Sequence, residues 1–198
     1  PLPGAAGMAG YHEDGHRRLS AMRQQAAGSM GIMIIVYTGN GKGKTSACIG
    51  QAMRALGRDF AVGFGQFMKQ PGCAGEQTIL ARLLGDDFLA GGKGFLRREE
   101  DRPAHREAAL ATLDWARQRL ERLDLLVLDE TLYALKAGIL ERSEVEELMD
   151  AARRARCHLV LSGRDAPDWL GAADLVTEMG EIKHPWRAGI KAAPGIEF

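Results

Sequence analysis

The chain has 198 residues, 45% of them hydrophobic, and is most simply one domain with a substantial core. Lys and Arg number 26, as do Asp and Glu, so the net charge of +0 gives no reason to expect nucleic acid or an anionic membrane as partner. No apolar stretch approaches the roughly 20 residues that span a bilayer, and three cysteines without a C-x-x-C pair favour a reducing, cytoplasmic location.

The first 30 residues differ in character from the rest of the chain. Residues 1–10 are expected to be disordered, and residues 11–28 predict a polar helix with too little apolar surface for a core of its own. We therefore expect residues 1–30 to be a mobile N-terminal extension with a helix, and residues 31–198 to form the folded domain.

After this extension, predicted strands alternate with predicted helices. The apolar run IMIIVY at 32–37 predicts a strand buried on both faces, and residues 44–57 predict a helix that ends at a glycine. A second strand is predicted at 60–68, which completes a βαβ unit. Residues 72–103 are rich in glycine and charge and hold one short helix at 76–84; long loops of this kind tend to carry function.

The alternation continues in the second half. Residues 104–123 predict a helix, residues 124–130 a strand, and a further amphipathic helix follows. Strands are predicted again at 157–163 and 174–179, with a helical turn between them at 166–173. The apolar faces of the two helices consist of Leu113, Ala116, Leu120 and Leu123, and of Val145, Leu148, Met149 and Ala152. This alternation predicts an α/β fold with an open, mostly parallel sheet and helices on both faces.

A glycine-rich loop follows the first predicted strand. Residues 38–46 read TGNGKGKTS, whereas the usual phosphate loop, G-x-x-x-x-G-K-[ST], has glycine where Thr38 stands. Glycines in this loop permit the positive φ angles that point backbone N–H groups at an anion. The order of strand, loop and helix favours a phosphate-binding loop over a surface turn. Its candidate residues are Gly39, Asn40, Gly41, Lys42, Gly43, Lys44, Thr45 and Ser46.

Two carboxylates, Asp129 and Glu130, end the strand LLVLDE. Carboxylates at the end of a buried strand are costly to desolvate unless a cation, a donor or water meets them. In a phosphate-loop fold this strand end lies beside the loop, so Asp129 and Thr45 are the candidate metal ligands; capping the next helix is the alternative role for Asp129. Together the two motifs indicate ATP or another nucleoside triphosphate with Mg²⁺ or Mn²⁺.

The residues alone leave the reaction open. The N-K-x-D of GTPases is absent, and no general base, Ser-His-Asp set or histidine cluster is evident. A nucleotide or small-molecule kinase remains an alternative, with Arg97, Arg98 and Arg102 as candidate lid residues. A nucleotide-binding switch without catalysis is a third hypothesis.

Five segments read YTGNGKGKTSACIGQAMRALG, GQFMK, LDLLVLDETLYAL, LVLSGRDAPDWLGAADLVTEM and IKHPWRAGIKAAPGIEF. In this order, from about residue 31 to residue 198, they resemble the phosphate-loop family of ATP:corrinoid adenosyltransferases, in which threonine at the first loop position is the family's own variant. The resemblance implies a phosphate-loop NTPase, RecA-like fold. It also implies transfer of the 5′-deoxyadenosyl group of ATP to the cobalt of a reduced corrinoid, with release of triphosphate, in adenosylcobalamin synthesis or salvage.

The resemblance also implies roles for the loop and the carboxylates. Co(I) is itself a strong nucleophile, which suits the missing protein base. Lys44 and the loop amides would stabilise charge on the triphosphate, with a metal at Thr45 and Asp129, and Glu130 would orient metal-bound water or ribose. The family suggests a homodimer, and reduction of the corrinoid implies an electron donor such as a flavoprotein.

The corrinoid side of the site departs from the family. The family's aromatic motif, roughly G-F-T-W, aligns with residues 94–97, where Phe95 matches but Arg97 replaces tryptophan. Packing in the core is the alternative role for Phe95. Leu96 or Trp186 could close the lower corrin face instead. The candidate corrinoid-binding residues are Phe95, Arg97, Arg164 and Trp186.

Overall fold

A computed structural model of the chain describes residues 31–164 and 171–197. The helix expected within residues 1–30, and most of the helical turn expected at 166–173, lie outside these residues. The chain divides into the units Pro1–Ile32 and Met33–Phe198, and the fold below is that of the second unit. Among the described residues, no helix combines the length and the apolar character needed to cross a membrane.

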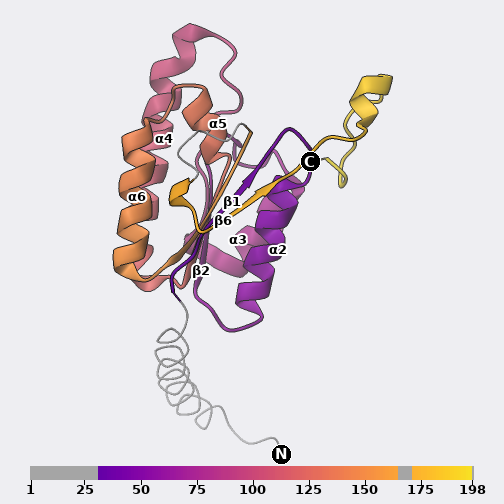
Figure 1. The fold of residues 1–198 in the computed structure, drawn as a ribbon. Helices are drawn as coiled ribbons and strands as arrows, with labels where there is room; N and C mark the ends of the chain where they lie inside the picture. Colours follow the sequence, from indigo (N-terminus) through magenta and orange to yellow (C-terminus); the bar gives the residue numbers. More distant parts are fainter. Residues whose placement is uncertain (1–30, 165–170, 198) are drawn as a thin grey trace, which may run out of the picture. The chain divides into compact units, whose positions relative to one another are not determined.

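Six strands form one parallel sheet in the order β3-β2-β4-β5-β1-β6 (Figure 1). They are β1 (Ile34–Thr38), β2 (Val62–Gln66), β3 (Phe88–Ala90), β4 (Leu125–Asp129), β5 (His158–Ser162) and β6 (Leu175–Glu178). The predicted α/β fold is thereby confirmed. Strand β3 is absent from the sequence prediction because its three residues are too few to form an apolar pattern.

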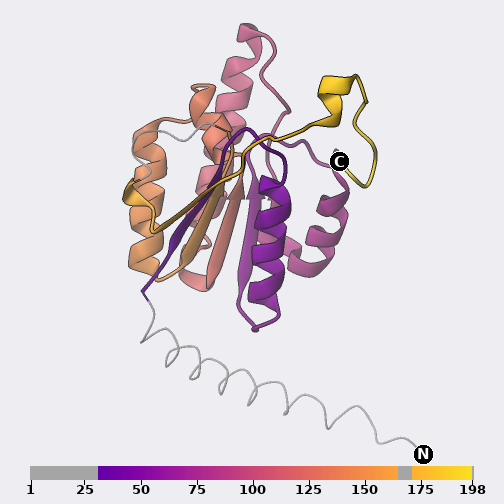
Figure 2. The same ribbon diagram turned by 45° about the vertical axis from the view of Figure 1, so that its right-hand side comes forward.

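Helices cover both faces of the sheet (Figures 1 and 2). On one face lie α2 (Lys44–Leu56) and α3 (Gly75–Leu84); on the other lie α4 (Arg102–Arg117), α5 (Thr131–Lys136) and α6 (Arg142–Ala155). The short helix α5, which has six residues, was not predicted.

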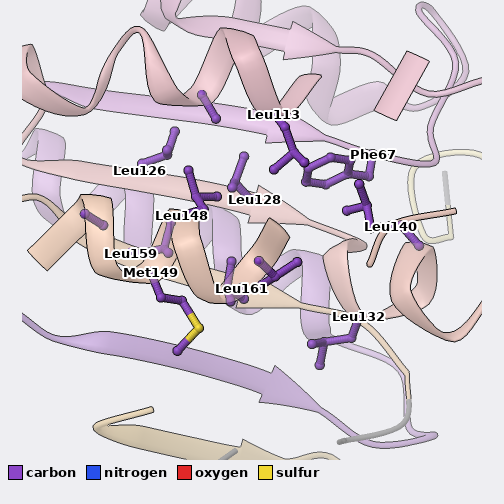
Figure 3. Packing of buried hydrophobic residues seen from close by; sticks show 14 of the residues in the cluster. Phe67, Leu113, Leu126, Leu128, Leu132, Leu140, Leu148, Met149, Leu159 and Leu161 are labelled. Atoms are coloured by element: carbon purple, nitrogen blue, oxygen red, sulfur yellow. The ribbon is translucent and has the colours of Figure 1, made fainter. Parts of the chain in front are cut away.

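Alternation along the central strand β4 supplies both layers of the core. Leu126 and Leu128 face α4, α5 and α6, whereas Leu125 and Val127 face α2 and α3, as expected of a strand buried on both sides. Figure 3 shows the larger cluster, in which leucines of β4 and β5 pack against the helices. All eight residues of the predicted apolar faces are buried: Leu113, Ala116, Leu120, Leu123, Val145, Leu148, Met149 and Ala152. The first predicted helix is shorter than expected, because α4 ends at Arg117; Leu120 begins a short 3-10 helix (Leu120–Arg122), and Leu123 follows it.

The parallel arrangement brings the carboxyl ends of all strands to one edge of the sheet. Gln66 at the end of β2 is in register with Asp129 at the end of β4, and Ser162 ends the next strand, β5. Strand β5 lies between β4 and β1, whose end leads into the glycine-rich loop. Polar residues from four adjacent strands therefore meet at this edge, where open α/β sheets commonly bind ligands.

Candidate functional site

The glycine-rich loop connects β1 to α2 and lies against the segment that follows β6. Gly39 has φ 97°, and a Cβ atom there would lie 2.4 Å from the carbonyl oxygen of Met179. The same oxygen accepts a 2.7 Å hydrogen bond from the Gly41 N–H. Thr38, by contrast, is the last residue of β1. Because its backbone is extended, this position needs no glycine, which explains how threonine is accommodated at the first motif position.

Lys44 begins α2, and its ammonium group lies inside the loop. Its Nζ donates hydrogen bonds of 2.8 Å to the Gly39 carbonyl and 2.6 Å to the Gly41 carbonyl. Burial, and then the positive charge of Arg164, lower the pKa of Lys44, while Glu130 and Asp129 oppose this shift. The loop therefore encloses a positive charge, which two of its carbonyl groups hold in place.

Asp129 is fully buried at the end of β4, and both of its carboxylate oxygens accept hydrogen bonds. Ser162 Oγ donates to Oδ1 at 2.6 Å, and Thr45 Oγ1 lies 3.2 Å from Oδ1 and 3.0 Å from Oδ2. Gln66 Nε2 lies 3.2 Å from Oδ2, and Lys69 Nζ lies 3.3 Å from it. These donors and the lysine compensate for the lost hydration of the carboxylate. Asp129 does not cap the next helix.

Glu130, which follows Asp129, is the N-cap residue of α5, and its backbone is left-handed with φ 63°. Its backbone N–H donates to Ser162 Oγ at 3.2 Å. Burial, and then the charge of Asp129, raise the pKa of Glu130 above its usual range. A non-glycine residue held in this backbone region stores strain, which proteins often tolerate at functional sites.

A cluster of polar residues beside Asp129 had no role in the sequence analysis. Lys69 Nζ lies 2.7 Å from Glu76 Oε1, and Gln66 Nε2 lies 3.2 Å from the same oxygen. Burial lowers the pKa of Lys69, but the charges of Asp129 and Glu76 outweigh it, so the pKa is raised. The sequence did contain one indication, because a polar residue ends each of these buried strands. That pattern would have marked Gln66 and Ser162 as candidate site residues.

The oxygen atoms of Thr45 and Asp129 fit a hard divalent cation. Thr45 and Asp129 offer hydroxyl and carboxylate oxygens, which Mg²⁺ and Mn²⁺ prefer. In the described part of the chain, no cluster of three or more His, Cys, Asp or Glu side chains could hold a metal ion. Mg²⁺ is commonly held by one or two protein oxygens together with substrate phosphates, so a large protein cage is not required.

Two cavities adjoin the cluster of polar residues beside Asp129. The first, of about 1030 Å³, is lined by Phe95, Arg97 and His105, among other residues. The second, of about 1080 Å³, is lined by Lys44, Thr45 and further residues of the loop. Both cavities border on Lys69, Phe95, Glu130 and Glu197. A ligand in one cavity would therefore meet a ligand in the other across these shared residues.

The candidate corrinoid residues are distributed between the two cavities. Phe95 borders both, is 61% exposed and contacts the Tyr133 ring edge-on at 5.3 Å between centroids, so it is not a core residue. Arg97 is exposed and lines only the first cavity, whereas Arg164 and Trp186 line only the second. Leu96 packs against the hydrophobic core instead of facing either cavity.

The family model for ATP:corrinoid adenosyltransferase BtuR/CobO/CobP matches residues 31–198. The chain belongs to this family. The corrinoid adenosyltransferase of Pseudomonas aeruginosa is 42% identical over 181 residues, covering 88% of this chain and 87% of that protein. That of Sinorhizobium sp is 38% identical, with coverages of 84% and 80%, and the corrinoid adenosyltransferase CobA of Salmonella typhimurium is 37% identical, with coverages of 91% and 92%.

Membership of the adenosyltransferase family confirms the resemblance seen in the five sequence segments. It also confirms the enzyme class, a transferase of an alkyl group. Nothing in the described part of the chain favours the kinase or the non-catalytic switch. The glycine-rich loop therefore belongs to an adenosyltransferase.

Proposed function

We propose that this adenosyltransferase joins the 5′ carbon of ATP to Co(I) of a reduced corrinoid at the junction of the two cavities. The single observation that carries the proposal is the position of Phe95, which borders both the loop cavity and the neighbouring one. ATP in the loop cavity would place its reacting end beside this ring. The corrinoid would lie on the other side of the ring, partly in the first cavity.

The reaction needs positioning and charge stabilisation from the protein, but no protein nucleophile. Co(I) supplies an electron pair to C5′, the C5′–O bond breaks, and its electron pair leaves with the triphosphate while cobalt becomes Co(III). Negative charge therefore grows on the triphosphate. Lys44 and residues 42–46 of the loop line the second cavity, where the ammonium group and the backbone N–H groups would stabilise that charge.

A divalent metal would be held by Thr45 and Asp129, together with phosphate oxygens. When bound, Mg²⁺ or Mn²⁺ would neutralise part of the triphosphate charge. Ser162 orients the Asp129 carboxylate toward Thr45, because it donates a hydrogen bond to Oδ1. Glu130 lies at the border of both cavities, where its carboxyl group would orient metal-bound water or the ribose.

The corrinoid would meet an aromatic surface of Phe95 and, on the loop side, Trp186. Both rings are well exposed, which suits side chains that become covered only when a large ligand binds. An apolar ring beside cobalt offers no lone pair to the metal. Arg97 and Arg164 would face the polar periphery of the corrin from the first and second cavity respectively.

We further propose that the enzyme acts in the cytoplasm as a homodimer. All three cysteines are free, which suits a reducing compartment. Ile79 and Leu83 lie one turn apart on α3 and are 50% and 52% exposed, which suits burial against a second copy. Reduction of Co(II) to Co(I) takes one electron, so the substrate implies an electron donor such as a flavoprotein.

The test is to incubate the full chain with ATP, Mg²⁺ and chemically reduced cobalamin without oxygen. We expect the light-sensitive absorption spectrum of a carbon–cobalt bond, and intact triphosphate in the phosphorus NMR spectrum. Asp129→Asn is the matched control, because it removes the charge while keeping the shape of the side chain. ADP as the main product would support the kinase alternative, and ATP binding without any product would support the switch.

A further inference from the structure

Lys69 lies where its ammonium group contacts both proposed metal ligands. The side chain follows β2, and its Nζ lies 3.3 Å from Thr45 Oγ1 and 3.3 Å from Asp129 Oδ2. A third contact, at 2.7 Å, joins Nζ to Glu76 Oε1. One cation therefore already lies against both the hydroxyl and the carboxylate.

This arrangement is supported by its surroundings. The Lys69 side chain is only 23% exposed and Glu76 only 16%, unlike a lysine that moves freely in solvent. Gln66 Nε2 bridges Glu76 Oε1 and Asp129 Oδ2 at 3.2 Å each, and Gln77 Nε2 in turn donates to Gln66 Oε1 at 2.9 Å. The carboxylates of Glu76 and Asp129 are thus held in positions where both contact the Lys69 ammonium group.

A metal ion and this ammonium group would compete for the same oxygen atoms. Mg²⁺ lies about 2.0–2.1 Å from its oxygen ligands, so a metal that bound Thr45 and Asp129 from the side of Lys69 would lie close to the present position of Lys69 Nζ. Two cations in such contact repel each other strongly in a site shielded from water. Lys69 therefore has to move before a metal can bind to both residues from the side that the ammonium group occupies.

We propose that Lys69 is the counter-cation of the Thr45–Asp129 pair in the nucleotide-free enzyme, and that a divalent metal displaces it only when the metal arrives as its ATP complex. The triphosphate would accept the displaced ammonium group, which would then act beside Lys44. The inference rests on the metal site of the proposed function. It adds that the protein excludes the free metal and thereby couples metal binding to nucleotide binding.

The first test is a Mn²⁺ titration of the nucleotide-free full chain, followed by electron paramagnetic resonance. Wild type is expected to bind Mn²⁺ weakly, and Lys69→Met at least about tenfold more tightly, because the carboxylates then lack their cation. Lys93→Met is the matched control, since Lys93 lines the first cavity without a contact to Asp129. Adding Asp129→Asn to Lys69→Met should remove the gain. Equal Mn²⁺ affinities of wild type and Lys69→Met would overturn the inference.

A second measurement does not depend on the folding of Lys69→Met. In wild type with ¹⁵N-labelled lysine, the Lys69 Nζ resonance can be assigned by its loss in the charge-conserving variant Lys69→Arg. We expect Mg²⁺ with ATP to shift this resonance and Mg²⁺ alone to leave it in place. An equal shift with Mg²⁺ alone would overturn the inference.

The two proposals fail in different ways. If wild type binds Mn²⁺ with ATP and transfers the adenosyl group, but Lys69→Met does not tighten Mn²⁺ binding, only the role of Lys69 is overturned. If wild type neither binds Mn²⁺ with ATP nor forms a carbon–cobalt bond, both proposals are overturned.

Discussion

Ser162 Oγ donates a 2.6 Å hydrogen bond to Asp129 Oδ1, and the two residues end adjacent parallel strands, β5 and β4. Ser162 Oγ also accepts a hydrogen bond from the backbone N–H of Glu130 at 3.2 Å. One hydroxyl group therefore orients the buried carboxylate and contacts the strained residue that follows it. This bond exists only because β5 lies beside β4 in the sheet.

Ser162→Ala is expected to lower the free energy of unfolding by about 1–3 kcal/mol, because Asp129 then loses a buried hydrogen-bond donor. It should also weaken binding of Mn²⁺–ATP, since the carboxylate is less well oriented. Urea unfolding and a Mn²⁺–ATP titration measure the two effects. Ser143→Ala, on the exposed surface of α6, is the control. If the two variants are equally stable, Ser162 does not support Asp129 as argued.

Lys44→Ala is expected to lower the turnover number by at least about 10²-fold while the fold stays intact. Loss of one preorganised charge contact to a transition state commonly has an effect of this size. Steady-state formation of the carbon–cobalt bond is the measurement, with circular dichroism as the check on folding. Lys42→Ala removes an exposed lysine paired with Glu197 at 3.3 Å and should have a smaller effect. Unchanged turnover in Lys44→Ala would contradict the assignment of the loop.

Phe95→Ala is expected to lower the fraction of four-coordinate Co(II) corrinoid in the ATP-bound enzyme, whereas Arg97→Trp is expected to raise it. The cavity left by alanine would admit a ligating water, and an added aromatic ring would exclude one. Electron paramagnetic resonance distinguishes the four- and five-coordinate forms. Leu96→Ala is the control, because Leu96 packs against the core. An unchanged distribution in Phe95→Ala would assign the lower corrin face to other residues.

Glu130→Gln is expected to raise the unfolding temperature at pH 7.5 and to have little effect at pH 4. Burial and the Asp129 charge raise the folded-state pKa of Glu130, so its ionisation disfavours the folded state. Below the pKa of about 4.3 that Glu130 has in the unfolded chain, the carboxyl group is protonated in both states, so its ionisation does not affect stability. The loss of stability appears as pH rises above this value. It is complete above the pKa of Glu130 in the folded protein.

Calorimetry across this pH range measures the effect of the Glu130 substitution. Glu107→Gln, on the exposed side of α4, controls for the loss of a negative charge in general. A stabilisation by Glu130→Gln that is equal at both pH values would contradict the assigned cause. Loss of adenosyl transfer in the same variant would indicate that the carboxyl group is retained for function at a cost in stability.

Cys73 is expected to be the one cysteine that a thiol reagent labels in the native protein at pH 8. It is exposed and lines the first cavity, whereas Cys48 and Cys157 are fully buried. Burial also raises the pKa of Cys157 to about 12 and that of Cys48 well above its usual value, so few of these thiols ionise at pH 8. Bound corrinoid should slow labelling of Cys73. Equal rates with and without corrinoid would argue against the first cavity as part of the corrinoid site.

The sequence by itself determined the fold class, most of the strands and the apolar faces of the main helices. These features depend on the spacing of residues close together in the chain, as the buried faces of α4 and α6 illustrate. Lys44 and Thr45 could be selected as candidates in the same way, because the loop motif is local. The carboxylates at 129 and 130 stood out because charge directly after a buried strand is unusual.

Only the tertiary structure decided which residues surround Asp129. Gln66, Lys69 and Ser162 are distant from it in the sequence, and they meet it because β2 and β5 flank β4 in the sheet. Strand β3 likewise depends on pairing with β2, since three residues carry too little pattern to predict it. The order of parallel strands is set by packing between distant segments, and no short stretch of sequence encodes it.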